Sequence, residues 1–197
     1  MNLRLLTFCA LTLTAASVST VAAADEVAPA TGFAGFSKGG SERNLLANAN
    51  FEKGTAGWEL LNWGRSSKME LDPNERHEGK AALRVDNLDG CHSFVRQLLT
   101  VKPHTRYRLS GYIKTRDVEP AKKGQRSGAI LMVGRMSVYT PLLTGTTPWT
   151  KVTVDFTTKD DAQIHVGPSV GTDATFARGS AWYSELRLTE LSGDERK

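Results

Sequence analysis

The chain has 197 residues, of which 40% are hydrophobic, and 25 Lys and Arg against 21 Asp and Glu give a formal net charge of +4. This length allows one domain with a substantial core. The positive excess is mild, and no basic stripe with interleaved aromatic residues and no zinc-ligand spacing occurs. Nucleic acid is therefore not expected as a partner.

The first 24 residues have the three parts of a secretory signal peptide. Met1–Arg4 is a short basic segment, residues 5–21 are mostly apolar, and residues 22–24 are three alanines. The apolar part contains Thr and Ser and is shorter than the roughly 20 residues that a membrane span needs. We expect residues 1–24 to be cleaved and the protein to be secreted or periplasmic, and not membrane-spanning.

Cysteine usage limits how an exported chain can be stabilised. Cys9 lies in the predicted signal peptide, so Cys91 is alone in the mature chain and no intramolecular disulfide can form. Stability must then come from the size of the core or from a bound metal. We expect Cys91 to be a small core or loop residue.

The rest of the chain predicts a linker and one all-β domain. Residues 25–43 are rich in Ala, Gly and Pro and indicate a flexible linker, whereas residues 44–191 show alternation with period two and recurring turn residues. Residues 192–197 form a short C-terminal tail. A brief first strand is expected at Asn44–Leu46. The further expected strands are Gly57–Trp63, Ser67–Leu71, Lys80–Asp86, His92–Val101, Thr105–Thr115, Ser127–Tyr139, Trp149–Thr157, Asp161–Val170 and Ser180–Leu191. Nine or ten strands predict a two-sheet sandwich or a closed barrel.

Alternation also predicts which side chains face the core. In Thr105–Thr115, Tyr107, Leu109 and Ile113 share one side. In the last strand the pattern favours burial of Trp182, Leu186 and Leu188, which places Tyr183, Glu185 and Arg187 on the opposite face.

Glu52 directly follows Phe51 in an Asn-rich turn. A carboxylate among backbone carbonyls suits a hard cation such as calcium. A solvated turn carboxylate fits the same pattern, and the residues alone leave both interpretations open.

Five segments, in order, resemble the family 4/9 (and 22-like) carbohydrate-binding modules. They are NLLANANFEKGTAGW at residues 44–58, ERHEGKAALRV at 75–85, QLLTVKPHTRYRLSGYIK at 97–114, PWTKVTVDFT at 148–157 and AWYSELRL at 181–188. The resemblance implies a jelly-roll β-sandwich of two antiparallel sheets with galactose-binding-domain-like topology. It also implies a polysaccharide or oligosaccharide ligand, bound in a groove across one sheet.

The resemblance further implies a structural calcium ion. Its ligands, carried over to this chain, are Glu52, Glu185 and the carbonyl oxygens of Asn50 and Lys80. The family closes this site with a pair of aspartates, which are replaced here by Ser184 and Glu185. A glutamate is one methylene longer than an aspartate and still a calcium ligand.

A sugar ring is bound by a flat aromatic surface with polar groups beside it. Candidates must therefore be aromatic and must point away from the core. Alternation selects Trp63, Tyr112 and Tyr139, and Arg135 shares a predicted face with Tyr139. We expect these four residues to form the carbohydrate-binding site.

Three functions remain open from the sequence. The first is an exported, non-catalytic carbohydrate-binding protein, with any glycan-degrading enzyme on a separate chain. The second is a structural or adhesion β-sandwich of the cell envelope without a sugar site. The third is a polysaccharide lyase built on His165, Tyr139 and Arg135, or a glycosidase, although the sequence places no pair of catalytic carboxylates. The binder requires exposed aromatic residues on one groove, whereas the structural protein requires them buried or dispersed.

Overall fold

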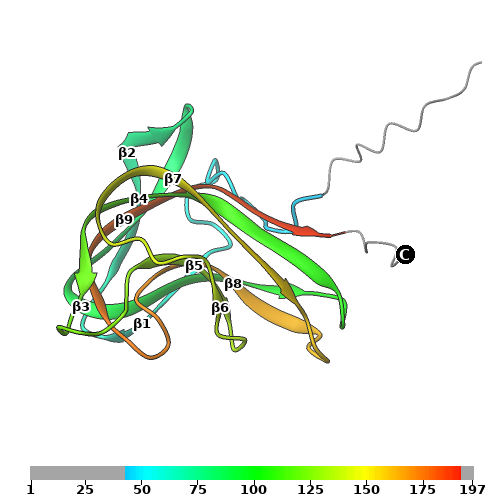
Figure 1. The fold of residues 1–197 in the computed structure, drawn as a ribbon. Coiled ribbons are helices and arrows are strands. Elements are labelled where there is room, and N and C mark those ends of the chain that lie inside the picture. The colour runs from blue at the N-terminus through cyan, green and yellow to red at the C-terminus, as the bar shows by residue number, and fades with distance from the viewer. Residues whose placement is uncertain (1–42, 192–197) are drawn as a thin grey trace, which may run out of the picture. The chain divides into compact units, whose positions relative to one another are not determined.

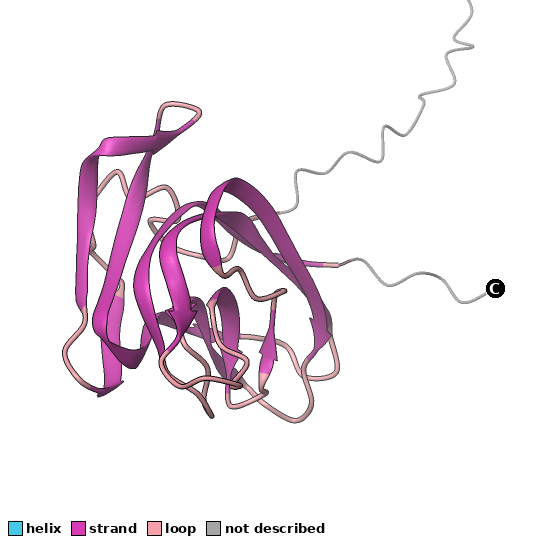
Figure 2. Ribbon diagram, turned by 60° about the vertical axis from the view of Figure 1, so that its left-hand side comes forward, coloured by secondary structure: helices cyan, strands magenta, loops and turns pink. Residues whose placement is uncertain are grey.

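The computed structural model describes residues 43–191, which contain nine strands and no helix (Figures 1 and 2). The strands are β1 (Glu59–Gly64), β2 (Lys68–His77), β3 (Lys80–Thr100), β4 (Arg106–Pro120), β5 (Ala129–Gly134), β6 (Val138–Tyr139), β7 (Gly145–Thr157), β8 (Gln163–Val170) and β9 (Ala177–Glu190). None of the described residues forms a helix that could span a membrane. The predicted signal peptide, nearly all of the linker and the tail lie outside the described residues.

All pairings are antiparallel, and the strands form two layers joined through β3 (Figure 1). The first part of β3 pairs with β2 and β9, and β9 continues to β4 and β7; we call this the β4 layer. The second part of β3 pairs with β1 and β8, and β8 continues to β5 and β6; we call this the β8 layer. The expected all-β sandwich is confirmed.

The bend of β3 is fixed by one buried amide. The pairing with β9 shifts register between Asn87 and Cys91, where β3 passes from one layer to the other. The Nδ2 group of Asn87 donates to the carbonyl oxygens of Cys91 at 3.0 Å, Val170 at 2.9 Å and Ala177 at 3.5 Å. Because these oxygens belong to β3, β8 and β9, Asn87 holds three strands together at the bend.

The core lies between the layers and follows the alternation expected for half-buried strands. Leu83 and Ile113 enter it from the β4 layer, and Val95, Leu131 and Val166 from the β8 layer, all with no exposed surface. Burying each such side chain stabilises the fold by about 1.5–3 kcal/mol. As expected for a small core residue, Cys91 is buried, and burial raises the pKa of its thiol.

Tyr183 crosses the core and ties the layers together. It belongs to β9, and its hydroxyl donates to the Ser169 carbonyl of β8 at 2.7 Å. Burial raises the pKa of Tyr183 well above its ordinary value. We expect Tyr183→Phe to lower the free energy of unfolding by about 1–2 kcal/mol, because it leaves a buried carbonyl without this donor. Chemical denaturation, with exposed Tyr139→Phe as control, tests this expectation, and equal stabilities of the two variants would contradict it.

The position of Tyr183 corrects the predicted burial pattern of the last strand. Tyr183 and Ala181 face the core, and Trp182 lies on the outer side of the β4 layer. Glu185 adopts a φ of 52°, and the pairing of β9 with β4 shifts register at this point. The resulting bulge exchanges the two faces of the strand, so that Leu186 and Leu188 point inward as expected while Trp182 does not.

Trp182 is covered on its outer side by cations. The guanidinium groups of Arg84 and Arg116 lie 5.4 Å and 5.1 Å from its ring centre, and the Lys114 ammonium lies 5.8 Å away. Its indole nitrogen donates to Asp72 at 2.8 Å. These contacts explain why a large aromatic residue on an outer face is only 3% exposed.

Several predicted strands are longer in the structure, such as β2 and β4, and three predictions gave the wrong number of strands. Residues 44–46 form no strand; instead the Asn44 side chain bonds to backbone groups of β9. The segments Lys80–Asp86 and His92–Val101 are one continuous strand, because a bulge replaces the expected turn. The expected strand Ser127–Tyr139 divides into β5 and β6 around a tight hairpin.

Candidate functional site

The outer side of the β8 layer carries a row of apolar and aromatic side chains, which we call the aromatic face. It is defined by Trp63 and Leu61 of β1, Phe94 of β3, Ile130 and Met132 of β5, and Tyr139 of β6. Neighbouring strands place these residues side by side, since Leu61 lies opposite Phe94 and Met132 opposite Tyr139. The edge strands β1 and β6 are four strand spacings apart, or about 19 Å. An extended ligand is therefore needed to span the face.

Trp63 presents a flat, supported ring at one edge of the aromatic face. Its side chain is 46% exposed. The ring stacks on His92, with 4.7 Å between ring centres and 18° between planes. The Nε2 atom of His92 lies 3.1 Å from the Ser169 hydroxyl, and burial lowers the pKa of His92. A neutral, hydrogen-bonded imidazole thus holds the indole in place with one surface toward solvent.

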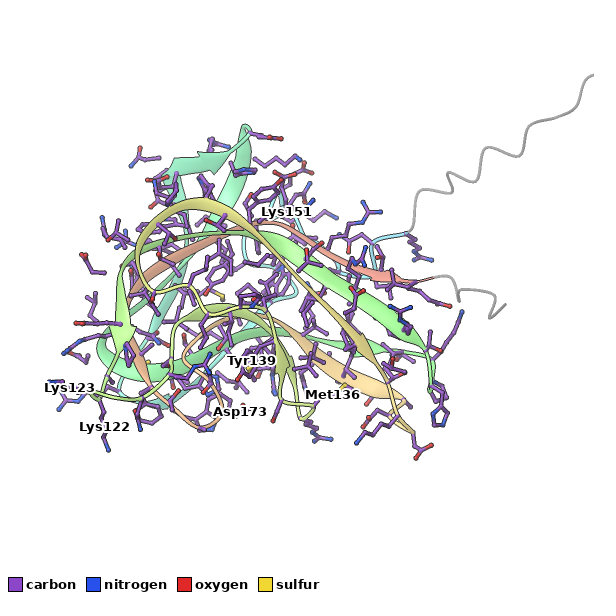
Figure 3. The ribbon with its side chains drawn as sticks, viewed as in Figure 1. Lys122, Lys123, Met136, Tyr139, Lys151 and Asp173 are labelled. Carbon is purple, nitrogen blue, oxygen red and sulfur yellow. The ribbon has the colours of Figure 1, made fainter. Side chains whose placement is uncertain are left out.

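Tyr139 stands at the opposite edge and is 43% exposed. Between the two edges, Phe94, Ile130 and Met132 form a small buried cluster with Leu142 that is separate from the core. Figure 3 shows Tyr139 together with Met136 on the side of the molecule opposite Lys151 of β7. Two exposed aromatic rings over an apolar floor suit the C–H faces of sugar rings.

Charged groups lie beside the aromatic face on β1, β3, β8 and the β5–β6 hairpin. Arg96 of β3 bonds to Glu59 of β1 at 3.0 Å. His165 of β8 lies opposite Gly134, next to Arg135 in the β5–β6 hairpin. Burial, followed by the positive charges of Arg96 and Arg135, lowers the pKa of His165. Two guanidinium groups therefore lie near His165, and this histidine favours its neutral form.

The four residues predicted to bind sugar do not share one face. Trp63, Arg135 and Tyr139 belong to the β8 layer, whereas Tyr112 belongs to β4 and lies opposite Ser184 and Lys151. Its half-buried ring stacks on His77 with 3.9 Å between ring centres. Tyr112 is thus separated from the aromatic face by the thickness of the sandwich.

Sequence reasoning missed Phe94 of the aromatic face and two residues of β3 that adjoin this face, His92 and Arg96. They occupy alternate positions of β3 on its outer side, while Ser93 and Val95 between them have no exposed surface. The signal was present, because the same parity rule that selected Trp63 applies to this strand. Phe94 escaped attention because a buried aromatic residue is ordinarily assigned to the core.

The residues predicted to bind calcium border two neighbouring pockets near the start of β3. Asn50, Lys80 and Glu185 line one pocket of about 470 Å³, and Asn50, Glu52 and Lys80 line the other, of about 340 Å³. The Glu185 carboxylate is bonded on one oxygen by the Lys80 ammonium and on the other by His77 Nδ1. Ser184 donates to the Ala81 carbonyl at 3.0 Å. Glu185 therefore does not fit a calcium ion as the side chains are placed.

His77, Glu78 and Glu185 bring their ligand atoms within 4.8 Å of one another. Burial acts to raise the pKa of Glu185, but the bonds from Lys80 and His77 outweigh it and lower this pKa below its ordinary value. The Lys80 ammonium already compensates the negative charge of the Glu185 carboxylate.

The described residues form a two-layered antiparallel β-sandwich with an aromatic face on its β8 layer. The family model described as a carbohydrate binding domain matches residues 43–166, and the chain belongs to this family.

Individual similarities are more distant. The chain is 27% identical to the tRNA nuclease WapA of Bacillus subtilis (strain 168), over 74% of this chain but only 7% of that protein. A xylan-binding domain, CBM22-1 of Paenibacillus barcinonensis Xyn10C, superposes with a TM-score of 0.53 at 17% identity, covering 78% of this chain and 97% of that one. TmCBM61, solved with β-1,4-galactotriose, gives 0.51 at 18% identity, covering 76% and 99%. These structures support the fold.

Proposed function

We propose that this protein is an exported, non-catalytic carbohydrate-binding protein that holds a polysaccharide across the aromatic face. The observation that carries the proposal is the pair of exposed rings, Trp63 and Tyr139, at opposite edges of one layer with an apolar floor between them. Sugar rings stack on the two aromatic residues, and hydroxyl groups bond to the polar side chains beside them. Membership of the carbohydrate-binding family supports this assignment.

The remaining parts of the proposal rest on the sequence. A cleaved signal peptide places the protein outside the cytoplasm, and its partners are a polysaccharide or oligosaccharide and a separate glycan-degrading enzyme or envelope protein. The exposure of Trp63 and Tyr139 on one layer favours the binder over a structural β-sandwich, in which such rings would be buried or dispersed. Tyr112, on the other layer, does not meet this criterion. The activity of a nuclease such as WapA does not carry over, because the chain matches so small a part of it.

Affinity electrophoresis in gels that contain soluble polysaccharides tests the proposal. We expect retardation of the wild-type protein and a loss of affinity of about 30-fold or more for the Trp63→Ala, Tyr139→Ala double variant, since the variant removes both proposed stacking contacts. Its melting temperature should stay close to that of the wild type, because both rings are exposed.

Tyr112→Ala is the matched control, since Tyr112 is an outward aromatic residue of the other layer. We expect this variant to bind as the wild type does. A loss of binding in a folded Tyr112→Ala protein would place the site on the β4 layer. No retardation by any polysaccharide would leave the structural interpretation in its place.

A further inference from the structure

The β5–β6 hairpin has an unusual backbone for its sequence. Arg135 and Ser137 adopt φ values of 68° and 51°, in the left-handed region that non-glycine residues seldom occupy. Met136 between them packs against the main core. Such conformations cost about 1–3 kcal/mol each and persist where the surroundings hold them, often at functional sites. Here the anchored hairpin keeps Arg135 exposed at the Tyr139 end of the aromatic face.

The charges around this hairpin are unbalanced. His165 of β8 lies beside it, and Arg96 of β3 lies one strand further away. The carboxylate acting on both, Glu59, is already bonded to Arg96. Among residues 43–191 the structure shows no ion pair for Arg135. Among the charged groups that act on His165, two guanidinium groups thus stand against a single carboxylate. A second anion at this point would be attracted by the unpaired guanidinium.

We propose that the polysaccharide bound on the aromatic face is anionic, and that Arg135, together with Arg96, binds its acidic group while the adjoining sugar ring stacks on Tyr139. This inference rests on the proposed function. A guanidinium matches the two oxygens of a carboxylate or sulfate with parallel hydrogen bonds, and such charge-assisted bonds are the stronger ones in proteins. A uronic acid and a sulfated sugar both supply this chemistry.

Binding constants for three polysaccharides test the inference: a neutral xylan, polygalacturonate as the carboxylate source and a carrageenan as the sulfate source. We expect preference for one or both acidic polymers and weaker binding at high salt. Arg135→Gln should weaken acidic binding about tenfold and leave xylan binding unchanged. Lys151→Gln is the control, because it removes an exposed cation on the opposite side of the molecule (Figure 3).

The outcomes separate the two proposals. Equal effects of Arg135→Gln on xylan and on both acidic polymers, or no preference for an acidic polymer, would overturn the anionic ligand and leave carbohydrate binding intact. If the wild-type protein binds none of the three polysaccharides, both the anionic ligand and the proposed carbohydrate-binding function are contradicted.

A second readout does not depend on affinity. Bound oligogalacturonate should raise the pKa of His165, because its charge offsets those of Arg96 and Arg135 that now lower this pKa. Titration of the His165 ring by NMR measures the change, and an unchanged pKa with the oligomer bound would count against the proposal.

A different observation carries a second inference. Lys80 and His77 occupy the two oxygens of Glu185, in the place where the family resemblance implies calcium. His77 is fixed by its stacking on Tyr112 and by an edge contact with Trp149, whose ring centre lies 5.3 Å away. We infer that the Lys80 ammonium takes the role of the divalent ion, so that the fold is independent of calcium.

Thermal unfolding tests this inference. The melting temperature of the wild-type protein should be the same in millimolar calcium and in chelator. Lys80→Met should lower the melting temperature, because Glu185 loses the cation that compensates its charge. Lys151 is an exposed lysine of the same layer, and Lys151→Met should leave the melting temperature unchanged. A rise of the wild-type melting temperature with calcium, or stoichiometric calcium binding in calorimetry, would refute the inference.

Discussion

Replacing Asn87 with Asp is expected to lower the free energy of unfolding by about 4 kcal/mol or more. The Nδ2 group of Asn87 donates to carbonyl oxygens of three strands, and its Oδ1 atom has no partner. The stabilising contribution therefore comes from the donating amide. Aspartate has the same size but sets a negative oxygen against three carbonyl oxygens in a site with no exposed surface.

Denaturant titration measures this effect, with Asn62→Asp as the control. Asn62 is an exposed residue of β1, so the same chemical change should alter stability by less than about 0.5 kcal/mol. Asn87→Ala separates the two causes, because it removes the donor without adding a charge and should fall between the wild type and Asn87→Asp. An Asn87→Asp protein as stable as the wild type would show that the bend of β3 does not depend on this clamp.

Gly179→Ala is expected to be nearly as damaging, with a loss of about 3–4 kcal/mol. Gly179 lies on β9 against a bulge of β4, and its φ is +114°. An added Cβ would lie 2.4 Å from the Asp117 carbonyl oxygen and 2.7 Å from the Val118 Cα atom. Both are backbone atoms of a paired strand, so neither can move aside without breaking the pairing of β4 with β9.

Gly124→Ala isolates the backbone contribution of this substitution. Gly124 has a φ of +84°, and an added Cβ would find no atom within 4 Å. The control variant therefore carries the conformational strain without the collision, at about 1 kcal/mol. If the two alanine variants lose the same stability, close packing of β9 on β4 is not the reason for a glycine at position 179.

The sequence predicted the fold well wherever side chains alternate without interruption. Tyr107, Leu109 and Ile113 face the core as their spacing indicates. The prediction failed at β-bulges, because a rule based on strict alternation cannot detect a residue inserted into a strand. The irregular backbone at Glu185 in this way places Tyr183 in the core and Trp182 on the outer side of β9, where other side chains bury it.

The candidate site shows a different limit of the same reasoning. Alternation predicted that Trp63, Tyr112 and Tyr139 point away from the core, and the structure confirms this for all three. It gave no information on which layer each strand joins, since pairing between strands depends on contacts distant in the sequence. Tyr112 was therefore grouped with residues on the other side of the sandwich. The exposed position of Arg135 likewise depends on a left-handed backbone conformation, which an arginine in the sequence does not predict.

The passage of β3 through both layers has a consequence for how the protein acquires its structure. The hydrogen-bond ladders of both layers share this one strand. We therefore expect the two layers to fold and unfold together. We expect amide protons of β2 and β8 to exchange with solvent through the same global opening, and folding to be a single slow step, as is usual where most pairings are distant in the chain. A sugar bound to one layer would then protect the other from exchange.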